Sequence, residues 1–583
     1  MDVRIGLGSE PSMYRKFFGT PFRQTLFCVL LSLLISSPAI LSGFMNDDYY
    51  FLTPLLTYES PFDYYSFASK GDDARLANWW AEDGFGIVFF RPISSLSLSL
   101  DFSVFGGNEL TAHLHSVLWF VLMLVGALRL LRGLLPPKNA ALASVIFAVG
   151  AYHTMTLAWV AARHAAVGGA FVMWSAHCYL RFRMESRRRL FAYSIVLFVL
   201  ALLSSEVALT VPIFAFSYEL AFADGPIRNR LEALSPLALI TLVYLIYYKL
   251  SGYGPNGSDM YLDPFRSPDR YLKELPEKCL WLMGAYLLGI PAIFANFPGA
   301  ESLPVVAGLL GLAGLLTAVF VAFPLDARRK RLVKWLGSLV FLGMIPAGAG
   351  MPDGRGALLS GVAVAALVAI LVSRLFQKRN ADHKRSKPAV LVAGVLLFGV
   401  LALSILIRLA LAGMMRVGVA AQAATGRTSF GCERGAIVYV INADFLGTIY
   451  DSVVVSAHQG AFFERWYVLS EPAHPLSVTY QGKDTLALDG RGAPLVHDMM
   501  FRLFRTARNP LSKGDVIKLP RLEVVVTAVE NDRPMAARLE IPDLTDRKKV
   551  CLLSFQEGRL RPFLLPAAGE TRIIDWGLPA ELP

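Results

Sequence analysis

The stretch Leu41-Ser-Gly-Phe-Met-Asn-Asp-Asp-Tyr-Tyr-Phe-Leu52 follows directly on an apolar run that begins near Leu26. Asn46, Asp47 and Asp48 therefore stand where a hydrophobic helix ends. Two adjacent carboxylates at such a boundary are costly, because like charges raise each other's pKa. Ionisable groups at the edge of a membrane span indicate function, although the same three residues also suit a helix end that only marks the water line.

The composition is typical of a membrane protein. Of the 583 residues, 55% are hydrophobic and only 17% are charged, and the mean hydropathy is +0.48. Many apolar runs reach roughly 17–25 residues, the length that crosses a bilayer as a helix. Lys and Arg fall in short clusters between these runs, which is the pattern of cytoplasmic loops. The net charge of +11 therefore indicates membrane orientation and is no sign of a nucleic-acid partner.

The same charge pattern predicts the orientation of the first span and of the long loop after it. Residues 1–24 are polar and basic and are expected in the cytoplasm, so the span at about 25–44 crosses outward and serves as an anchor. The loop 45–110 is then outside. We expect interfacial helices in this loop, at Tyr49–Thr57, Asp72–Ala81 and Arg91–Phe105. Trp79 and Trp80 fit an aromatic belt at the membrane surface, with sugar stacking as the alternative.

Further apolar runs predict a transmembrane domain over residues 25–417. The expected spans after the first are 112–133, 140–159, 164–182, 190–204, 207–222, 234–250, 303–324, 332–348, 357–376 and 388–412. The segment 275–295 is also apolar, but a crossing there would place the basic run Asp326–Arg331 outside. We therefore read it as an interfacial or re-entrant helix with Pro276 and Pro291 at its ends. The total is about eleven crossings, which leaves the C-terminus outside.

From residue 418 to 583 the pattern changes to that of a soluble all-β domain. Alternating strands occur at Ala436–Ile441 and Leu522–Glu530, and short turns separate such runs. Cys432 and Cys551 both lie in this domain. They could pair in an oxidising compartment, and the sequence leaves that open.

The order of several short motifs then resembles the GT-C membrane glycosyltransferases, in particular the branch of protein O-mannosyltransferases and tetratricopeptide-bearing O-mannosyltransferases. The resemblance covers about residues 25–380. The motifs are Asn46-Asp-Asp48, Phe90-Arg-Pro-Ile-Ser-Ser-Leu-Ser-Leu-Ser-Leu-Asp101 leading to Phe105-Gly106, His113-Leu-His115, Trp159-Val-Ala-Ala-Arg163, Leu202-Leu-Ser-Ser-Glu206 with Pro212, and Pro346 to Arg355. Two features depart from the family. Ser205 stands where relatives often have Lys. A β domain replaces the helical repeats, so the identity of the acceptor cannot be inferred from the family.

The resemblance implies transfer of a sugar from a polyprenyl-phosphate carrier to an acceptor hydroxyl or amine on the outer face. The first-loop carboxylate is similar to the family's catalytic acidic residue. Chemistry supports this reading, because an acceptor hydroxyl that attacks an anomeric carbon must lose its proton, and a placed carboxylate typically contributes about 10²–10⁴-fold. We take Asp47 as the first choice for this base. Asp48 would bind the acceptor, orient its neighbour or simply cap the helix end.

A lipid-phosphate leaving group needs cations, and the guanidinium fork of Arg suits phosphate oxygens. Arg355 lies in the Gly-rich outside loop Gly350-Met-Pro-Asp-Gly-Arg-Gly356 and is the first candidate. Arg91 and Arg163 are also outside by this topology, with interfacial snorkelling as the alternative for each.

Further polar residues at the outside ends of spans are candidates for binding substrate. They are His113, His153, His164, Glu206 and Asp101. Glu206 could pair with Arg163 and Asp101 with Arg91, in which case their role is structural. The spacing of the His residues matches no compact metal-ligand motif. We therefore expect no metal site and no cofactor, although a divalent ion stays open.

Together these features predict an inverting, polyprenyl-phosphate-sugar-dependent transferase. We expect it in a bacterial-type inner membrane, with a periplasmic β domain that helps to position a protein or glycan acceptor. A transporter of lipid-linked sugars is one alternative, but transporters more often carry charges in mid-membrane and paired repeats. A non-catalytic assembly subunit is the other.

Overall fold

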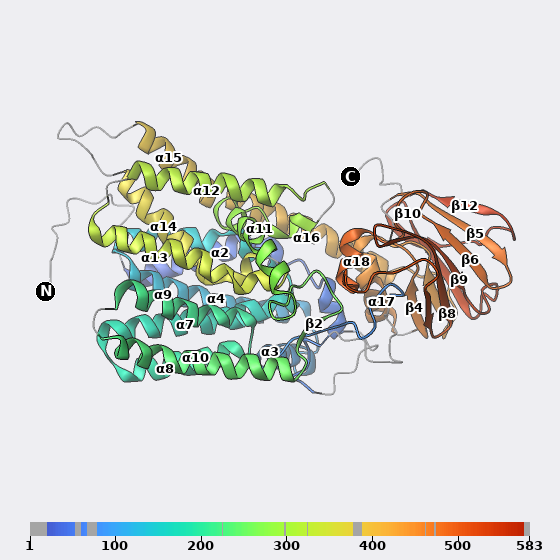
Figure 1. Ribbon diagram of the computed structural model, residues 1–583, viewed down its shortest axis with the longest axis horizontal. Coiled ribbons are helices and arrows are strands. Elements are labelled where there is room, and N and C mark those ends of the chain that lie inside the picture. Colours follow the sequence, from blue (N-terminus) through green and yellow to red (C-terminus); the bar gives the residue numbers. More distant parts are fainter. Residues whose placement is uncertain are drawn as a thin grey trace.

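The computed structural model describes residues 20–52, 60–66, 78–223, 226–296, 299–322, 325–351, 353–376, 387–460, 462–471 and 474–575. The molecule is elongated, with a bundle of helices at one end and a β-rich domain at the other (Figure 1). The basic loop predicted at Gln377–Lys387 and the segment 1–19 of the N-terminus lie outside the described residues, apart from Lys387, which begins a helix.

The bundle contains all the long helices. In chain order they and the shorter ones are α2 (Pro21–Ile40), α3 (Pro92–Ser103), α4 (Glu109–Leu134), α5 (Pro137–Val149), α6 (Thr154–Ala158), α7 (Arg163–Glu185), α8 (Arg188–Leu202), α9 (Thr210–Phe222), α10 (Ile227–Leu250), α11 (Pro268–Leu287), α12 (Leu303–Ala322), α13 (Ala327–Met344), α14 (Leu358–Leu375), α15 (Lys387–Leu397) and α16 (Ser404–Arg427). Single turns connect them: η1 (Asn46–Phe51), η3 (Ala151–His153), η4 (Val160–Ala162), η5 (Glu206–Leu209), η6 (Ala292–Asn296), η7 (Pro346–Ala349), η8 (Gly354–Ala357) and the π-helical η9 (Phe398–Leu403).

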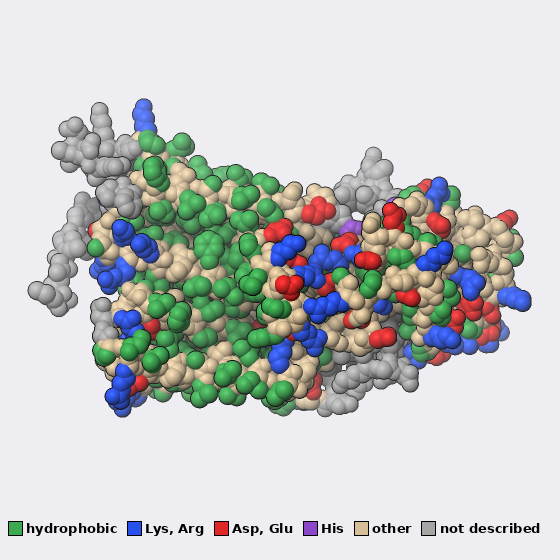
Figure 2. Space-filling view, in the orientation of Figure 1, with side chains coloured by type: hydrophobic (Ala, Val, Ile, Leu, Met, Phe, Trp, Pro, Cys, Tyr) green, Lys and Arg blue, Asp and Glu red, His purple; other side chains and the backbone are tan. Residues whose placement is uncertain are grey.

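The bundle is apolar on its outside, as a lipid-facing surface requires. Large side chains such as Leu34, Phe320 and Leu391 are 71%, 82% and 68% exposed. Figure 2 shows a broad hydrophobic surface over the bundle, Lys and Arg at its far end, and a mixed band of charges beside the β-rich domain. Within the described residues, seven helices are long and apolar enough to cross a membrane, or eight if the bent pair α5–α6 counts as one span. The multi-pass helical fold is thus confirmed, whereas the expected count of eleven crossings stays a prediction.

Two expected segments differ in detail from the helices that form. The span predicted at 140–159 is broken at Gly150, and α5 and α6 meet at an angle of 50°. The free N–H of Ala151 at this break is satisfied by Ser404 Oγ at 3.1 Å, so a neighbouring helix supports the bend. In the segment predicted at 275–295, Pro276 lies inside α11 and does not mark a helix end, because α11 starts eight residues earlier at Pro268.

The C-terminal region confirms the predicted β domain and adds helices to it. One sheet has the order β11-β10-β3-β4 and includes parallel pairs, and an antiparallel sheet has the order β12-β5-β6-β9-β8-β7. The strands are β3 (Ile437–Val440), β4 (Arg465–Val468), β5 (Leu476–Gly482), β6 (Thr485–Asp489), β7 (Val516–Leu519), β8 (Leu522–Glu530), β9 (Arg533–Glu540), β10 (Val550–Gln556), β11 (Arg559–Pro562) and β12 (Thr571–Ile574). The helices α17 (Phe445–Gln459) and α18 (Asp498–Phe504) were not predicted. The transmembrane helix α16 runs on to Arg427, past the boundary expected at 418.

A disulfide and two tryptophans hold the C-terminal domain together and to the first loop. Cys432 and Cys551 are bonded, with Cα atoms 5.6 Å apart, which answers the question that the sequence left open. Trp79 and Trp80 are 1% and 0% exposed and belong to the hydrophobic core of this domain. The indole N–H of Trp79 donates to the carbonyl of Leu469 at 2.9 Å. The expectation of an aromatic belt at these two positions is therefore wrong, because both rings are removed from any lipid surface.

The first loop also forms a small sheet with the bundle. Strand β1 (Gly86–Val88) pairs antiparallel with β2 (Gly254–Asn256), which follows α10. The helix expected at Asp72–Ala81 is a turn over residues 79–81, and 72–77 lie outside the described residues. Of the other two interfacial segments, the first shares only residues 49–51 with η1, and its residues 53–57 lie outside the described ranges, whereas the second forms α3.

Candidate active site

Asn46, Asp47 and Asp48 begin η1, and a different part of the chain holds each of them. Asn46 has a φ of +50°, in the left-handed region that Asn tolerates better than most residues. Its backbone N–H donates to Gln422 Oε1 at 3.1 Å, and its Oδ1 accepts from Gln422 Nε2 at 2.9 Å. The last turns of α16 thus hold the start of η1 with two hydrogen bonds.

Asp48 is fully buried and binds backbone only. Its carboxylate accepts the N–H of Met45 at 3.0 Å, closing the start of η1, and the N–H groups of Ala161 at 2.7 Å and Val160 at 3.4 Å. Burial raises the pKa of Asp48 to about 7, against the effect of these hydrogen bonds. The side chain therefore ties the first loop to η4, and the capping role left open by the sequence matches its contacts.

Asp47 is only partly buried and has a side-chain partner. The hydroxyl of Tyr450 on α17 donates to its Oδ1 at 2.9 Å. Burial raises the pKa of Asp47 to about 6, while the Tyr450 hydrogen bond and the charge of Arg355 lower it. A carboxylate with a pKa near neutrality is suited to general base catalysis. Of the two adjacent acids, Asp47 is the one with an accessible carboxylate.

Arg355 approaches Asp47 from η8. Asp353 caps this turn, since its Oδ1 accepts the N–H of Arg355 at 3.0 Å, and its Oδ2 lies 3.1 Å from Arg355 Nε. The guanidinium carbon lies 5.0 Å from the ring centre of Trp159. Arg355 Nη1 is shielded from solvent and has no hydrogen-bond partner among the described residues. Asp353 therefore holds the Nε side of the Arg355 guanidinium group in place, while Nη1 can still donate to an oxyanion.

Arg91 and Glu206 form the second charged pair of the site. Arg91 Nε and Nη2 both donate to Glu206 Oε2, at 2.9 and 2.7 Å. The Tyr248 hydroxyl lies 3.3 Å from the other oxygen of Glu206. The pair meets because the backbone N–H of Ile93 donates to the carbonyl of Leu203 at 3.0 Å, which brings the start of α3 against the end of α8.

Asp101 and Arg163 form a separate, closed cluster. Both side chains are 0% exposed and form an ion pair with each other, and His115 Nδ1 lies 2.8 Å from the other Asp101 oxygen. The remaining N–H groups of Arg163 donate to neighbouring oxygens, which are Ser116 Oγ, Ser97 O and Ala112 O. Arg163 has little donor capacity left for a phosphate, so we assign it a structural role.

The acid–base pairs are thus exchanged relative to the sequence expectation. Asp101 was expected beside Arg91, and Glu206 beside Arg163. Spacing along the chain could not decide this, because each pair joins segments at least 62 residues apart whose contact depends on helix packing: Asp101 with Arg163, and Arg91 with Glu206, whose separation is 115.

The three candidate histidines have different surroundings. His164 Nδ1 lies 3.1 Å from Ser205 Oγ, and the ring is within electrostatic reach of Arg91 and Arg355. His113 lies between the carbonyls of Gly43 and Leu157, each 3.1 Å from a ring nitrogen. His153 is fully buried among aromatic rings, with Nε2 2.9 Å from the carbonyl of Phe147. Only His164 therefore lies with the charged residues of the site.

Tyr261 lies close to the charged residues of the site, which we define as Asp47, Arg91, His164, Glu206 and Arg355. Its hydroxyl lies within electrostatic reach of both carboxylates and both guanidinium groups of this set. Burial raises the pKa of Tyr261 to about 12, so the phenol stays neutral. The sequence pointed to neither Tyr261 nor Tyr450, because each reaches the site through contacts between segments that are far apart in the chain. Among the described residues, no three His, Cys, Asp or Glu side chains gather closely enough to hold a metal ion.

Comparison with known proteins gives matches of fold only. No protein-family model and no curated protein sequence matches the chain. Among solved structures it is similar to the oligosaccharyltransferase AglB of Archaeoglobus fulgidus in complex with an inhibitory peptide and a dolichol-phosphate, with 13% identity, a TM-score of 0.45, and coverage of 78% of this chain and 65% of that one. It is also similar to ArnT from Cupriavidus metallidurans bound to undecaprenyl phosphate, with 13% identity, a TM-score of 0.41, and coverage of 75% and 85%.

The chain spans 65% of the length of the archaeal oligosaccharyltransferase. At this identity and these TM-scores the likeness says nothing about the reaction, and we base the functional proposal on the site residues.

Proposed function

We propose that this protein is an inverting membrane glycosyltransferase. It moves a sugar from a polyprenyl-phosphate donor to an acceptor on the outer face of a bacterial-type inner membrane. The observation that carries the proposal is the approach of a partly accessible carboxylate, Asp47, to a guanidinium group, Arg355, with one unoccupied donor. A base beside a phosphate-binding cation is what this transfer needs.

Asp47 acts as the general base. It accepts the proton of the acceptor hydroxyl as the acceptor oxygen attacks the anomeric carbon of the donor. The bond between that carbon and the phosphate oxygen breaks on the opposite side, which inverts the configuration. The pKa of about 6 leaves the carboxylate ionised at neutral pH and still basic enough to accept the proton.

Arg355 stabilises the leaving phosphate. Negative charge grows on the phosphate oxygen as the sugar leaves, and a fixed guanidinium group at that point lowers the barrier. The pairing of Nε with Asp353 holds the fork, and Nη1 remains for the phosphate. Arg91 supplies further positive charge, although Glu206 balances most of it. We propose that His164 and Tyr261 bind the sugar.

The lipid tail of the donor lies in an apolar groove beside Arg91. A cavity of about 380 Å³ is lined by Phe90, by Leu202 and Leu203 of α8, and by Val243 and Tyr244 of α10, among others. Its lining is almost wholly hydrophobic and adjoins the Arg91–Glu206 pair through Phe90 and Leu203. A polyprenyl chain in this groove would bring its phosphate toward the charged residues of the site.

The C-terminal domain supplies Tyr450 and, in this proposal, holds a protein or glycan acceptor on the periplasmic side. The N-terminus is then cytoplasmic. The cluster of Lys and Arg at the bundle end far from the β-rich domain supports this orientation, since cytoplasmic loops are enriched in both (Figure 2).

An Asp47→Asn variant tests the proposal. We expect transfer from a polyprenyl-phosphate sugar to fall by about 10²–10⁴-fold, because the base is gone while the shape remains. Binding of the lipid donor and the melting temperature should stay near wild type. Asp63→Asn is the matched control, since Asp63 lies exposed in the same loop. Undiminished transfer by the Asp47→Asn protein would refute the proposal, and a protein that moves lipid-linked sugar across the membrane without transfer would be a transporter.

A further inference from the structure

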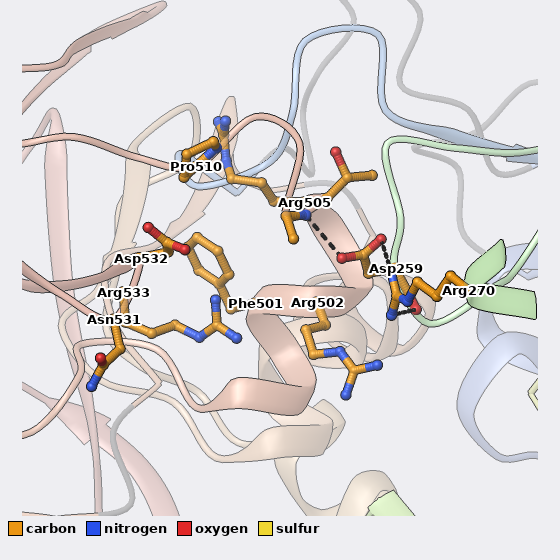
Figure 3. A pocket seen from close by; sticks show the side chains of 11 residues that line it. Asp259, Arg270, Phe501, Arg502, Arg505, Pro510, Asn531, Asp532 and Arg533 are labelled. Carbon is orange, nitrogen blue, oxygen red and sulfur yellow. Dashed lines mark hydrogen bonds and ion pairs between the residues drawn. The ribbon is translucent and has the colours of Figure 1, made fainter. Parts of the chain in front are cut away.

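A second cavity lies at the seam between the bundle and the C-terminal domain (Figure 3). Its volume is about 310 Å³, and none of the residues of the proposed active site lines it. The lining comes from three segments: the connection between β2 and α11 with the first turn of α11, the end of α18 with the loop after it, and the turn between β8 and β9 with the start of β9. A ligand there would contact both domains.

The lining of this seam cavity is rich in arginine. It contains four guanidinium groups but only two carboxylates, and the members are Arg270, Arg502, Arg505, Arg533, Asp259 and Asp532. Figure 3 shows Arg270 and Asp259 on one side and Arg502 and Arg533 coming from the C-terminal domain on the other. Four like charges repel one another around a small space unless anions offset them.

The carboxylates nearby are distributed unevenly over the four arginines. Arg270 has two of them, because Asp259 Oδ1 lies 2.5 Å from its Nη1 and Glu274 Oε1 lies 2.7 Å from its Nε. Arg502 and Arg533 share a single carboxylate, that of Asp498 on α18, and the contact with Arg502 is loose at 3.7 Å. Two guanidinium groups therefore have one counter-charge between them.

The fourth guanidinium group serves as a clamp. The hydrogen bonds of Arg505 within the described residues go to backbone carbonyls, those of Trp80 at 2.8 Å, Ala81 at 2.9 Å and Asn509 at 2.8 Å. It thereby fixes the first loop to the C-terminal domain and still contributes its charge to the cavity. Glu82, which also accepts hydrogen bonds from Thr506 and Asn509, offsets part of the charge of Arg505.

We propose that the seam cavity binds a phosphate-class oxyanion. A doubly charged phosphate balances two guanidinium groups, and the planar forks of Arg502 and Arg533 offer the paired donors that phosphate oxygens accept.

Two sources could present this chemistry. Free phosphate can enter from solvent, whereas a lipid headgroup would enter from the bundle side. There Phe265 and Leu272, close to Arg270 in sequence, are 64% and 65% exposed and could meet acyl chains. This inference does not rest on the proposed sugar transfer.

Calorimetric titration of the full-length protein in detergent with inorganic phosphate forms the first arm of the test. The second arm measures phosphatidylglycerol retained in native mass spectra after reconstitution in nanodiscs of phosphatidylcholine with and without that lipid. We expect binding in at least one arm, and the arm that responds identifies the source. Arg502→Gln should weaken that binding by about tenfold, and the double variant Arg502→Gln/Arg533→Gln should weaken it further.

Arg538→Gln is the matched control. It lies on β9 like Arg533, is half exposed beside Glu540, and does not line the cavity. Its binding should equal that of wild type. If the double variant lowers the melting temperature, its loss of binding is not interpretable, and the single variant Arg502→Gln is used to test the proposal. The Arg502 side chain is 36% exposed, so this substitution should leave the fold intact. Absence of binding in both arms, or equal binding by wild type and Arg502→Gln, would overturn the proposal.

Discussion

The protein has two carboxylate–arginine pairs of interest, Asp101 with Arg163 and Asp47 with Arg355. They differ in how many of their hydrogen-bond donors and acceptors are still without a partner. Asp101 and Arg163 are both 0% exposed, and their polar atoms are used by each other, by His115 and by backbone carbonyls. Asp47 is partly accessible, and Arg355 Nη1 has no partner among the described residues. The residue types are the same, yet of these two arrangements only the second leaves an arginine donor without a partner among the described residues.

The comparison teaches that unused donors and acceptors, rather than charge alone, distinguish a site from a structural ion pair. A buried pair that is broken on one side leaves an uncompensated charge, so its members are retained for stability. A donor that is fixed but unoccupied is kept ready for a ligand.

Asp101→Asn should destabilise the protein most. Arg163 would remain buried without its counter-charge, which costs about 3–5 kcal/mol. We expect a lower melting temperature in detergent, measured by tryptophan fluorescence. In the double variant Asp101→Asn/Arg163→Met the buried charge is gone, so part of the stability should return. A melting temperature of Asp101→Asn equal to that of wild type would contradict the structural assignment of this pair.

Arg355→Ala should weaken donor binding more than acceptor binding. The loss of charge-assisted hydrogen bonds to phosphate is worth about 1.5–3 kcal/mol, and the fold of the protein should be unchanged. Separate binding isotherms for the lipid donor and the acceptor measure the difference. Arg355→Lys keeps the charge without the fork and should be intermediate. Equal losses for donor and acceptor would argue against a phosphate contact.

Tyr450→Phe should move the pH dependence of transfer. The hydrogen bond from Tyr450 lowers the pKa of Asp47, so its removal raises that pKa, by roughly one unit for a hydrogen bond to a charged group. A base works only when deprotonated, and the acid limb of the rate profile should therefore shift to higher pH.

The other groups facing Asp47 remain in this variant: Arg355 from η8, Tyr261, and Asp48 and Tyr50 from η1. Tyr50→Phe is the matched control, because its hydroxyl donates to the carbonyl of Ile449 at 3.2 Å. The shift can also be read without turnover, from the carboxyl infrared band that is lost in Asp47→Asn. An unchanged midpoint of that band in Tyr450→Phe would show that the hydrogen bond does not tune Asp47.

Filling the apolar groove should have the smallest effect. Val243→Trp would occupy the space proposed for the lipid tail and reduce donor affinity severalfold, as measured with a short-chain and a long-chain polyprenyl phosphate. Leu242→Trp is the control on the same helix, since Leu242 is 55% exposed and does not line the groove. The groove serves the Asp47–Arg355 site and does not contact the Asp101–Arg163 ion pair. The melting temperature should therefore be the same for Val243→Trp and Leu242→Trp.

Part of the molecule could be predicted because its signals are local. The length of apolar runs predicts membrane helices, and period-two alternation over Leu522–Glu530 predicts a strand, which is β8. Other features depend on distant contacts. Trp79 and Trp80 look like interfacial residues until the C-terminal domain, almost 400 residues later, surrounds them. The break at Gly150 is supported by Ser404, which has no counterpart in the local pattern.

The sequence by itself determined the helical membrane bundle, the following β domain, and the choice of Asp47 and Arg355 as residues of interest, whose catalytic roles stay predictions. The pairing of each acid with its arginine, the capping role of Asp48 beside an accessible Asp47, and the hydrogen bond from Tyr450 to Asp47 across 403 residues became visible in the folded protein. The physical reason is that backbone geometry and apolar periodicity act over a few residues. Ion pairing and accessibility depend on which segments the packed helices bring together.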